Sequence, residues 1–483
     1  MHAISLSPEN LAAVDAELTA ANRAFMEIYP GESDRRQAVH TVYGGAHLFK
    51  ADSTAKLGEG ALRSLREFAS TPADLARILG ADWQPAFAET LYARVVGKLT
   101  REPVEDFRLD FEDGYGNRVD EEEDGHAAQG ARQVAAGLAA DTLPPFIGIR
   151  IKPFNDDLRE RSMRTLDIFI TTLIAETGGK LPPNFVVTLP KVQIAEQVSA
   201  AAALLTMLEQ KLGLATGSIP IEPMIETPQA VIDRDGRCPL LGIVRAAGGR
   251  CRSVHFGVYD YTASCGITAA YQAMGHPVCD FARAHMIVAL AGTGVHLSDG
   301  ATNILPVAPH RGETLTGAQV SRNFEAVHTA WKLGYDDNLR SLRNGIYQGW
   351  DLHPAQLVAR YAAVYSFFLA GLEAASGRQK AFVEKAALAS LFGNVFDDAA
   401  TGQGLLNFFL RGIACGAISE TEALETGLTL DEIRSRSFYQ ILTAHGHDNL
   451  WRNGSHHSVA DFFVRFDIST GHDLFCRTHS CQP

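Results

Sequence analysis

Residues 221–228, IEPMIETP, form a short apolar run that closes on a carboxylate, Glu226, and on Pro228. Proline is favoured in the first turn of a helix, so this stretch predicts a buried strand followed at once by a helix. Comparable apolar runs recur along the chain. The eight candidate strands are His40–Tyr43, Phe107–Phe111, Phe146–Ile151, Phe185–Leu189, Ile219–Ile225, Ser253–Val258, Gly294–Leu297 and Ile346–Leu352.

The segments between these runs have helical periodicity, for example at 130–138, 158–174, 194–212 and 280–290. Strand and helix that alternate eight times are typical of a (β/α)8 TIM barrel, an α/β fold. A doubly wound sheet shows the same alternation, and counting strands does not separate the two folds.

The two ends of the chain differ from this alternating part. A capping serine before Pro8 predicts a helix over 8–28. Helical patterns without intervening strands follow at 380–393, 403–415 and 419–427. The expected parts are an N-terminal helical segment (1–36), the barrel (37–365), a helical C-terminal region (366–444) and a polar tail (445–483).

Composition narrows the class of protein. The 483 residues include 43 Lys and Arg against 56 Asp and Glu, for a net charge of −13, with 46% hydrophobic residues. These values are typical of a globular chain, and the acidic balance argues against a nucleic-acid partner. No apolar run predicts a membrane span, the N-terminus lacks a signal-peptide pattern, and the seven cysteines are scattered. We therefore expect a cytoplasmic protein that binds neither membrane nor nucleic acid.

Ligands of such barrels bind where the strands end, and two early strands end in charged residues. The second candidate strand runs into Asp110, Glu112 and Asp113, three carboxylates that need a cation or a basic group nearby. The third contains Arg150, which must be paired if buried and whose planar fork suits a carboxylate. The pattern predicts a metal-binding or substrate-orienting group. An exposed acidic loop and a purely structural ion pair of Arg150 remain open.

The fifth and sixth candidate strands end in single carboxylates, Glu226 and Asp260. Neighbouring parallel strands lie about 4.8 Å apart, so side chains at equivalent strand ends can share one ion. Two carboxylates with water and substrate oxygens are a usual way to hold Mg²⁺. The pair therefore predicts a metal site.

These motifs resemble those of the citrate lyase beta subunit and malate synthase superfamily, metal-dependent barrel enzymes of the phosphoenolpyruvate/pyruvate type. The motifs keep the family's order across residues 106–357, about half of the chain. The length and the terminal regions mark a divergent long branch. The matching motifs are LDFED (109–113), GIR (148–150), LPKV (189–192), MIETP (224–228), GVYDY (257–261) and DLHPAQ (351–356).

The resemblance implies a role for each matching residue. Glu226 and Asp260 would hold Mg²⁺, with Mn²⁺ as an alternative ion. Arg150 would bind the substrate carboxylate or an enolate oxygen, and Glu112 and Asp113 would orient water and Arg150.

Four further residues match the family's motifs. Gly257, Thr227 and Lys191 would contribute to substrate binding, and His353 is a catalytic candidate. Lys191 is equally compatible with a solvated strand end, and His353 with a histidine whose nitrogens are satisfied by backbone groups.

The implied activity is a Mg²⁺-dependent C–C bond lyase of the aldol or Claisen type, similar to citrate lyase. It would act on a small 2-oxo or hydroxy acid, or its CoA thioester, through a metal-stabilised enolate. Two alternatives stay open: phosphoryl transfer as in phosphoenolpyruvate-using barrels, and a non-catalytic metabolite-binding barrel.

The chain departs from the family at the general base. Relatives that use thioesters take an aspartate from a C-terminal segment, but the corresponding position here is Ser419, followed by Glu420. Candidate bases are therefore His353, Glu420, Asp397 and Asp398. Because the C-terminal segment of relatives often covers a neighbouring subunit's barrel, we expect a homo-oligomer.

Overall fold

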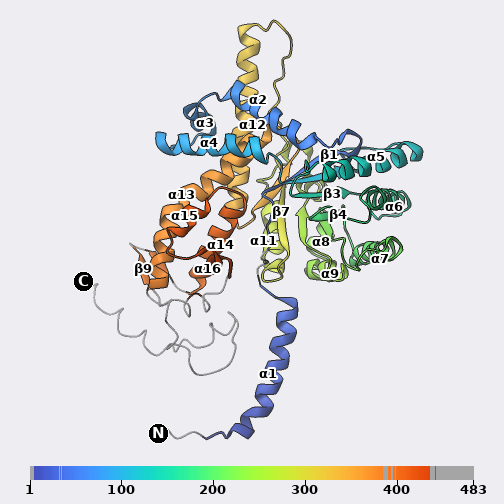
Figure 1. Ribbon diagram of the computed structural model, residues 1–483, viewed down its shortest axis with the longest axis vertical. Coiled ribbons are helices and arrows are strands. Elements are labelled where there is room, and N and C mark those ends of the chain that lie inside the picture. Colours follow the sequence, from blue (N-terminus) through green and yellow to red (C-terminus); the bar gives the residue numbers. More distant parts are fainter. Residues whose placement is uncertain are drawn as a thin grey trace, which may run out of the picture. The chain divides into compact units, whose positions relative to one another are not determined.

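Eight strands pair in the order of the sequence, all in parallel, and the last pairs with the first. They are β1 (His40–Gly45), β2 (Asp106–Asp110), β3 (Phe146–Arg150), β4 (Phe185–Leu189), β5 (Ile221–Ile225), β6 (Ser253–Phe256), β7 (His296–Ala301) and β8 (Gln348–Asp351). The computed structural model in Figure 1 describes residues 5–31, 33, 35–384, 390–392, 395–397, 399–435 and 441. Closure through β1 and β8 confirms the predicted (β/α)8 barrel and excludes the doubly wound sheet.

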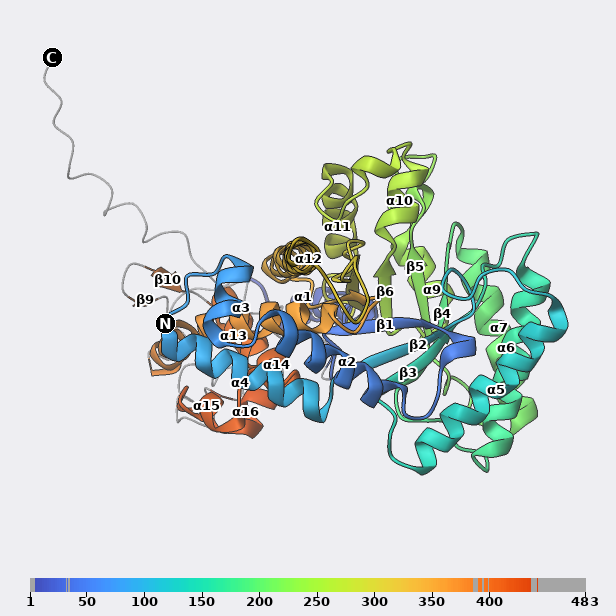
Figure 2. The ribbon, with the colours of Figure 1, turned by 90° about the horizontal axis from the view of Figure 1, so that it is seen from above.

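Helices follow the strands and cover the outside of the barrel. They are α2 (Ser53–Phe68), α3 (Pro72–Leu79), α4 (Pro85–Arg101), α5 (Asp120–Ala139), α6 (Arg159–Glu176), α7 (Ala195–Leu212), α8 (Pro228–Val231), α9 (Leu240–Ala246), α10 (Val258–Ser264), α11 (Pro277–Leu290), α12 (Gly317–Arg343) and α13 (Gln356–Glu384), with short 3-10 turns η1 (Ala46–Leu48) and η2 (Ala269–Tyr271). Figure 2 shows α5, α6 and α7 outside β2, β3 and β4. Side chains such as Ile149, Val187 and Ile225 are at most 1% exposed because helices cover the strands.

Local sequence explains where several helices begin. Pro228 is the first residue of α8, directly after β5, as the IEPMIETP stretch predicts. Thr71 accepts a hydrogen bond from the backbone N–H of Asp74 and caps α3. Thr316 caps the long helix α12 in the same way. These caps satisfy backbone N–H groups that the first helical turn leaves unpaired.

The N-terminal segment contains the predicted helix, α1 (Pro8–Ile28). Ser7 caps it through a reciprocal pair of hydrogen bonds with Asn10. Its apolar side chains, among them Leu11 and Phe25, are about half exposed.

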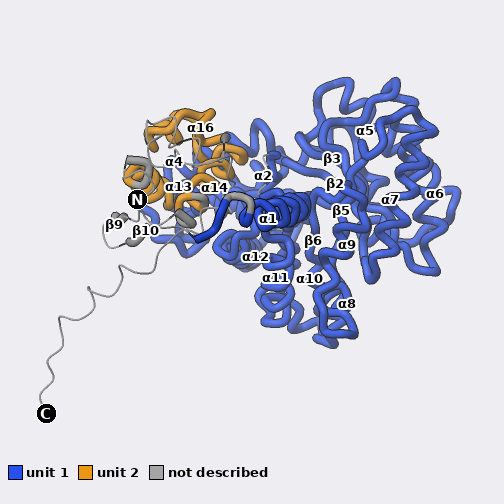
Figure 3. The backbone as a smooth tube through the Cα atoms, turned by 90° about the horizontal axis from the view of Figure 1, so that it is seen from below, with its two compact units in different colours: residues 1–369 blue, residues 370–483 orange. Residues whose placement is uncertain are grey.

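The chain divides into two compact units, residues 1–369 and 370–483, which Figure 3 distinguishes by colour. The second unit contains α14 (Ala399–Ala414), α15 (Glu420–Leu424) and α16 (Leu430–Ser435). It also contains an antiparallel pair, β9 (Ser390–Phe392) and β10 (Val395–Asp397).

This strand pair corrects the prediction of a helix over 380–393 with no strands nearby. Gly393 and Asn394 separate two short runs in the sequence, a composition that favours a hairpin over a continuous helix. The tail predicted at 445–483 lies outside the described residues.

One described helix has the length and composition of a membrane span, the Gln356–Ala381 part of α13. Most of its most apolar stretch, 61%, is buried inside the structure. Burial of this kind is typical of a helix that packs in a protein core.

Candidate active site

Charged side chains gather where five neighbouring strands end. The strands run in parallel, so their carboxyl ends meet at one mouth of the barrel, where ligands of this fold bind. Hydrogen bonds and ion pairs connect side chains from the ends of β2, β3, β4, β5 and β6. We call the following residues the mouth cluster: Asp110, Glu112, Asp113, Arg150, Lys191, Glu226 and Asp260.

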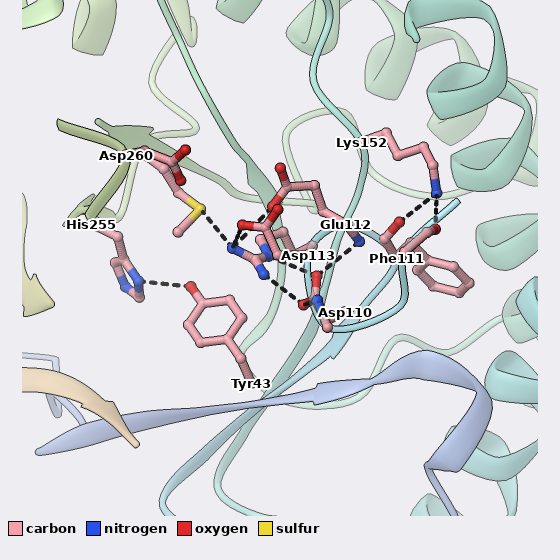
Figure 4. Close-up of polar contacts among 12 residues, drawn as sticks. Tyr43, Asp110, Phe111, Glu112, Asp113, Lys152, His255 and Asp260 are labelled. Carbon is pink, nitrogen blue, oxygen red and sulfur yellow. Dashed lines mark hydrogen bonds and ion pairs between the residues drawn. The ribbon is translucent and has the colours of Figure 1, made fainter. Parts of the chain in front are cut away.

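Arg150 points into the barrel and is held from several sides. Its Nε and Nη2 donate to the two carboxylate oxygens of Asp110 at 2.7 and 2.5 Å. Its Nη1 lies 3.2 Å from Glu112 and 4.0 Å from Asp113, so the guanidinium approaches both residues named from the sequence. The ring of Tyr43 lies beneath the guanidinium, 4.7 Å from ring centre to Cζ. Figure 4 shows these contacts around Asp110 and Glu112.

Asp110 is the closest partner of Arg150, although the resemblance to the family gives individual roles only to Glu112 and Asp113. The two residues are direct neighbours in the register of β2 and β3. Side chains of register partners point to the same face of a sheet, so both point into the barrel. Alternation along β2 was the signal that could have found this contact.

Glu226 is buried at the end of β5, and its Oε1 accepts a hydrogen bond from the backbone N–H of Lys191 at 2.5 Å. Burial and the nearby charge of Asp260 raise the pKa of Glu226 to about 8. A Cβ at Gly257 would meet Oε2 of Glu226 at 2.1 Å. Gly257 is therefore the residue that leaves room for this carboxylate.

Lys191 extends its side chain into the mouth cluster. Its Nζ contacts Glu112 and lies 3.4 Å from both Asp113 and Asp260. Burial opposes the charge, but the carboxylates of Glu226 and Glu112 outweigh it and raise the pKa of Lys191 above its ordinary value. The side chain is 29% exposed, so it lies at a partly covered position rather than at a solvated strand end.

The structure does not draw every predicted residue into this cluster. Thr227 is buried and donates its hydroxyl to the backbone carbonyl of Val192, a contact that fixes the loop after β4. His353 follows β8, and the backbone N–H of Ala355 donates to its Nδ1. Burial and the charge of Arg311 lower the pKa of His353.

The C-terminal base candidates fall in the second unit. Ser419 caps α15 by accepting from the backbone N–H of Glu422, which explains a serine at this position. Glu420 is exposed and pairs with Arg434 at 2.9 Å. Asp397 belongs to β10, and Asp398 lies outside the described residues.

A second group of charges, which sequence reasoning missed, lies inside the barrel. Arg108 contacts Asp106 and donates to the two oxygens of Glu222 at 3.1 and 3.3 Å. Nε2 of His255 lies 2.8 Å from Glu222, and its Nδ1 lies 2.9 Å from the hydroxyl of Tyr43. All five side chains are buried. We call Asp106, Arg108, Glu222, His255 and Tyr43 the interior cluster.

The residues of the mouth fit a divalent cation. Two carboxylates, Glu226 and Asp260, supply the hard oxygen ligands that Mg²⁺ prefers. Burial and mutual repulsion work against the charge of Glu226, and a cation would relieve both. In the described parts of the chain, no group of three or more His, Cys, Asp or Glu side chains forms a ready-made metal site. Water and substrate oxygens would therefore have to complete the coordination.

Fold and site define a (β/α)8-barrel protein whose charged groups gather at the C-terminal mouth, the usual position of a barrel active site. The chain belongs to the DUF6986 family, a domain of unknown function, whose model matches residues 18–441. No curated protein matches the chain.

Solved structures match the chain at low sequence identity. A citrate lyase from Burkholderia xenovorans LB400 is 16% identical, with a TM-score of 0.51, over 82% of this chain and 97% of that one. A malate synthase of Haloferax volcanii, in its magnesium and glyoxylate complex, is 16% identical with a TM-score of 0.41, over 84% and 99%. The first similarity confirms, at the level of the fold, the resemblance to the citrate lyase superfamily.

Proposed function

We propose that this protein is a Mg²⁺-dependent C–C bond lyase, with Mn²⁺ as an alternative ion. Its substrate would be a small 2-oxo or hydroxy acid or the CoA thioester of one. The observation that supports the proposal is that Lys191 contacts both Glu226 and Asp260 at the barrel mouth, near an Arg150 that Asp110 holds in place. Carboxylate ligands next to a guanidinium suit a substrate that has both a carboxylate and a neighbouring oxygen.

The chemistry needs stabilisation of negative charge. In the proposed cleavage, a base takes the proton of the hydroxyl on the carbon β to a carbonyl, that carbon becomes a new carbonyl group, and the Cα–Cβ bond breaks. The electron pair of that bond passes to Cα and is delocalised onto the original carbonyl oxygen as an enolate, which then takes up a proton. A bound cation would stabilise the charge on the substrate's oxygens.

Arg150 would supply the second stabilising contact. Asp110 holds two of its nitrogens, which leaves Nη1 directed toward Glu112 and the mouth. A donor fixed in this way needs no reorganisation when charge develops. Glu112 and Asp113 would orient water and the guanidinium, and Lys191, Thr227 and Gly257 would shape the substrate site.

The proton donor or acceptor is assigned to His353 as the first candidate. It follows β8 at the same end of the barrel, and its lowered pKa favours the neutral imidazole that a base requires. A protein of this class would act in the cytoplasm, and we propose a homo-oligomer.

The test is a turnover assay of the full chain with MgCl₂ on a panel of 2-oxo acids and of malyl- and citramalyl-type thioesters. We expect Mg²⁺-dependent release of a 2-oxo acid, lost in Glu226→Gln and Asp260→Asn. Phosphate transfer from phosphoenolpyruvate would replace the proposal by a phosphoryl-transfer function. Binding of 2-oxo acids without turnover of any panel member would replace it by a non-catalytic binding barrel.

A further inference from the structure

The ammonium of Lys191 lies among the carboxylates that are candidates for a metal. Its Nζ contacts Glu112 and is 3.4 Å from Asp260, one of the two proposed ligands. It is also 3.4 Å from Asp113. An ammonium therefore already lies beside Asp260, one of the two carboxylates that a divalent ion would have to reach.

The backbone of Lys191 ties the same residue to the other proposed ligand. Its N–H donates to Glu226, and its φ of +51° is in the left-handed region that a residue with a side chain adopts at a cost. This conformation turns the chain sharply after β4, so that main chain and side chain both face the mouth. Lys191 thus contacts both proposed metal ligands, Glu226 through its backbone N–H and Asp260 through its Nζ.

The mouth cluster needs such a counter-ion. It contains five carboxylates, Asp110, Glu112, Asp113, Glu226 and Asp260, but two cations. Asp110 accepts hydrogen bonds from two nitrogens of Arg150, so the guanidinium neutralises carboxylates that follow β2. Lys191 reaches the β5 and β6 side with its Nζ at Asp260 and its backbone N–H at Glu226.

We propose that Lys191 is a built-in competitor of the divalent cation. Its ammonium neutralises the carboxylates when no ion is bound, and the ion must displace it to reach Glu226 and Asp260. Two cations at this separation repel each other, so displacement weakens the affinity for the ion. The released ammonium can then pair with a carboxylate of the substrate, which makes ion and substrate bind in concert. This inference rests on the proposed function, because it concerns the metal of that site.

Calorimetric titration of the full chain with MgCl₂ alone tests the competition. In Lys191→Met we expect Mg²⁺ to bind at least about tenfold more tightly than in the wild type, and to keep this gain in 0.5 M KCl. High salt screens the repulsion between distant charges but not a direct contact. A gain in Mg²⁺ affinity that remains in 0.5 M KCl therefore shows that Lys191 competes for the ion's position and does not merely repel the ion from a distance. The matched control is Lys180→Met, an exposed lysine that precedes β4, which should leave the affinity unchanged.

The unfolding temperatures of the same variants give a second measurement, which reports the stability of the protein with and without Mg²⁺. Without Mg²⁺, Lys191→Met should unfold at a lower temperature than the wild type because its carboxylates lose their counter-ion. MgCl₂ should raise the unfolding temperature of the variant by more than that of the wild type.

The outcomes separate this inference from the proposed function. Equal or weaker Mg²⁺ binding by Lys191→Met, or a gain that disappears in 0.5 M KCl, overturns the inference while the metal site stands. Absence of Mg²⁺ and Mn²⁺ binding by both the wild type and Lys191→Met overturns both. Tight binding that survives Glu226→Gln in the Lys191→Met background would also overturn both, since the ion would then lie elsewhere.

Discussion

The mouth cluster and the interior cluster lie in the same barrel, but they differ in how far cations offset their carboxylates. In the interior cluster, two carboxylates, Asp106 and Glu222, share one guanidinium and one imidazole. Burial opposes ionisation of Glu222, but Arg108 and His255 outweigh it and hold its pKa below the usual range. Hydroxyls add further contacts, from Thr41 to Asp106 and from Thr188 and Ser253 to Glu222.

At the mouth, the carboxylates outnumber the cations, and the pKa of Glu226 is raised to about 8. Carboxyl groups whose pKa is shifted in this way cluster at functional sites. From this difference we infer that the interior cluster stabilises the barrel, and we propose that the mouth cluster binds the ligand. Four substitutions can break or sharpen this comparison.

The largest effect should follow from Arg108→Met. The change leaves Asp106 and Glu222 buried without their shared cation, and breaking a buried ion pair costs about 3–5 kcal/mol. The free energy of unfolding in urea measures it. As a control, Arg132→Met removes an exposed arginine paired with Glu176, and should cost less than about 1 kcal/mol. Similar losses in both variants would show that the interior cluster does not stabilise the barrel.

Arg150→Lys should affect activity more than stability. Lysine keeps the charge but loses the two-point contact with Asp110 and the planar group over Tyr43. We expect kcat to fall about 10²–10³-fold on whichever panel substrate is turned over, the size of a lost oxyanion donor. Arg159→Lys, at a solvent-exposed pair with Asp156, is the matched control. A loss confined to unfolding free energy would make Arg150 a structural residue.

The same comparison explains what could be predicted from the sequence. Strand positions were predicted to within a few residues because strands buried on both faces are nearly continuous apolar runs, as at Phe185–Leu189. The charges at strand ends were predicted because they interrupt those runs.

The interior cluster was missed because its partners come from distant strands. Arg108 and Glu222 are 114 residues apart in the sequence, and no local pattern pairs them. Asp106, Arg108 and Asp110 do alternate along β2, and strict alternation of charges in a buried strand is the signal that points into a barrel. The β9–β10 pair was missed because its strands are three residues long and lack a period.

Glu226→Gln should change how stability depends on pH. The pKa of Glu226 is raised in the folded protein to about 8, so its contribution to stability is present below pH 4.5 and is lost as pH rises toward 8. Without metal, the variant should therefore be more stable than the wild type at pH 8, by a few kcal/mol, and not at pH 4. Urea unfolding at both pH values measures this. The exposed Glu196→Gln is the control. A pH-independent difference would contradict the raised pKa.

The smallest effect should come from Tyr43→Phe, at the residue that joins the two clusters. Its ring lies under Arg150, and its hydroxyl is hydrogen-bonded to His255. Phenylalanine keeps the ring and removes the hydroxyl, which leaves Nδ1 of His255 without this partner and should cost about 1 kcal/mol of unfolding free energy. The exposed Tyr271→Phe should cost nothing measurable.

The same variant decides whether the two clusters act independently. Because the ring under Arg150 remains, the affinity for Mg²⁺ should not change in Tyr43→Phe, although the interior has lost a hydrogen bond. Calorimetric titration with MgCl₂ gives the answer. A change in affinity of tenfold or more would mean that the interior cluster sets the position of Arg150 through Tyr43. The barrel core would then be part of the binding machinery rather than only its support.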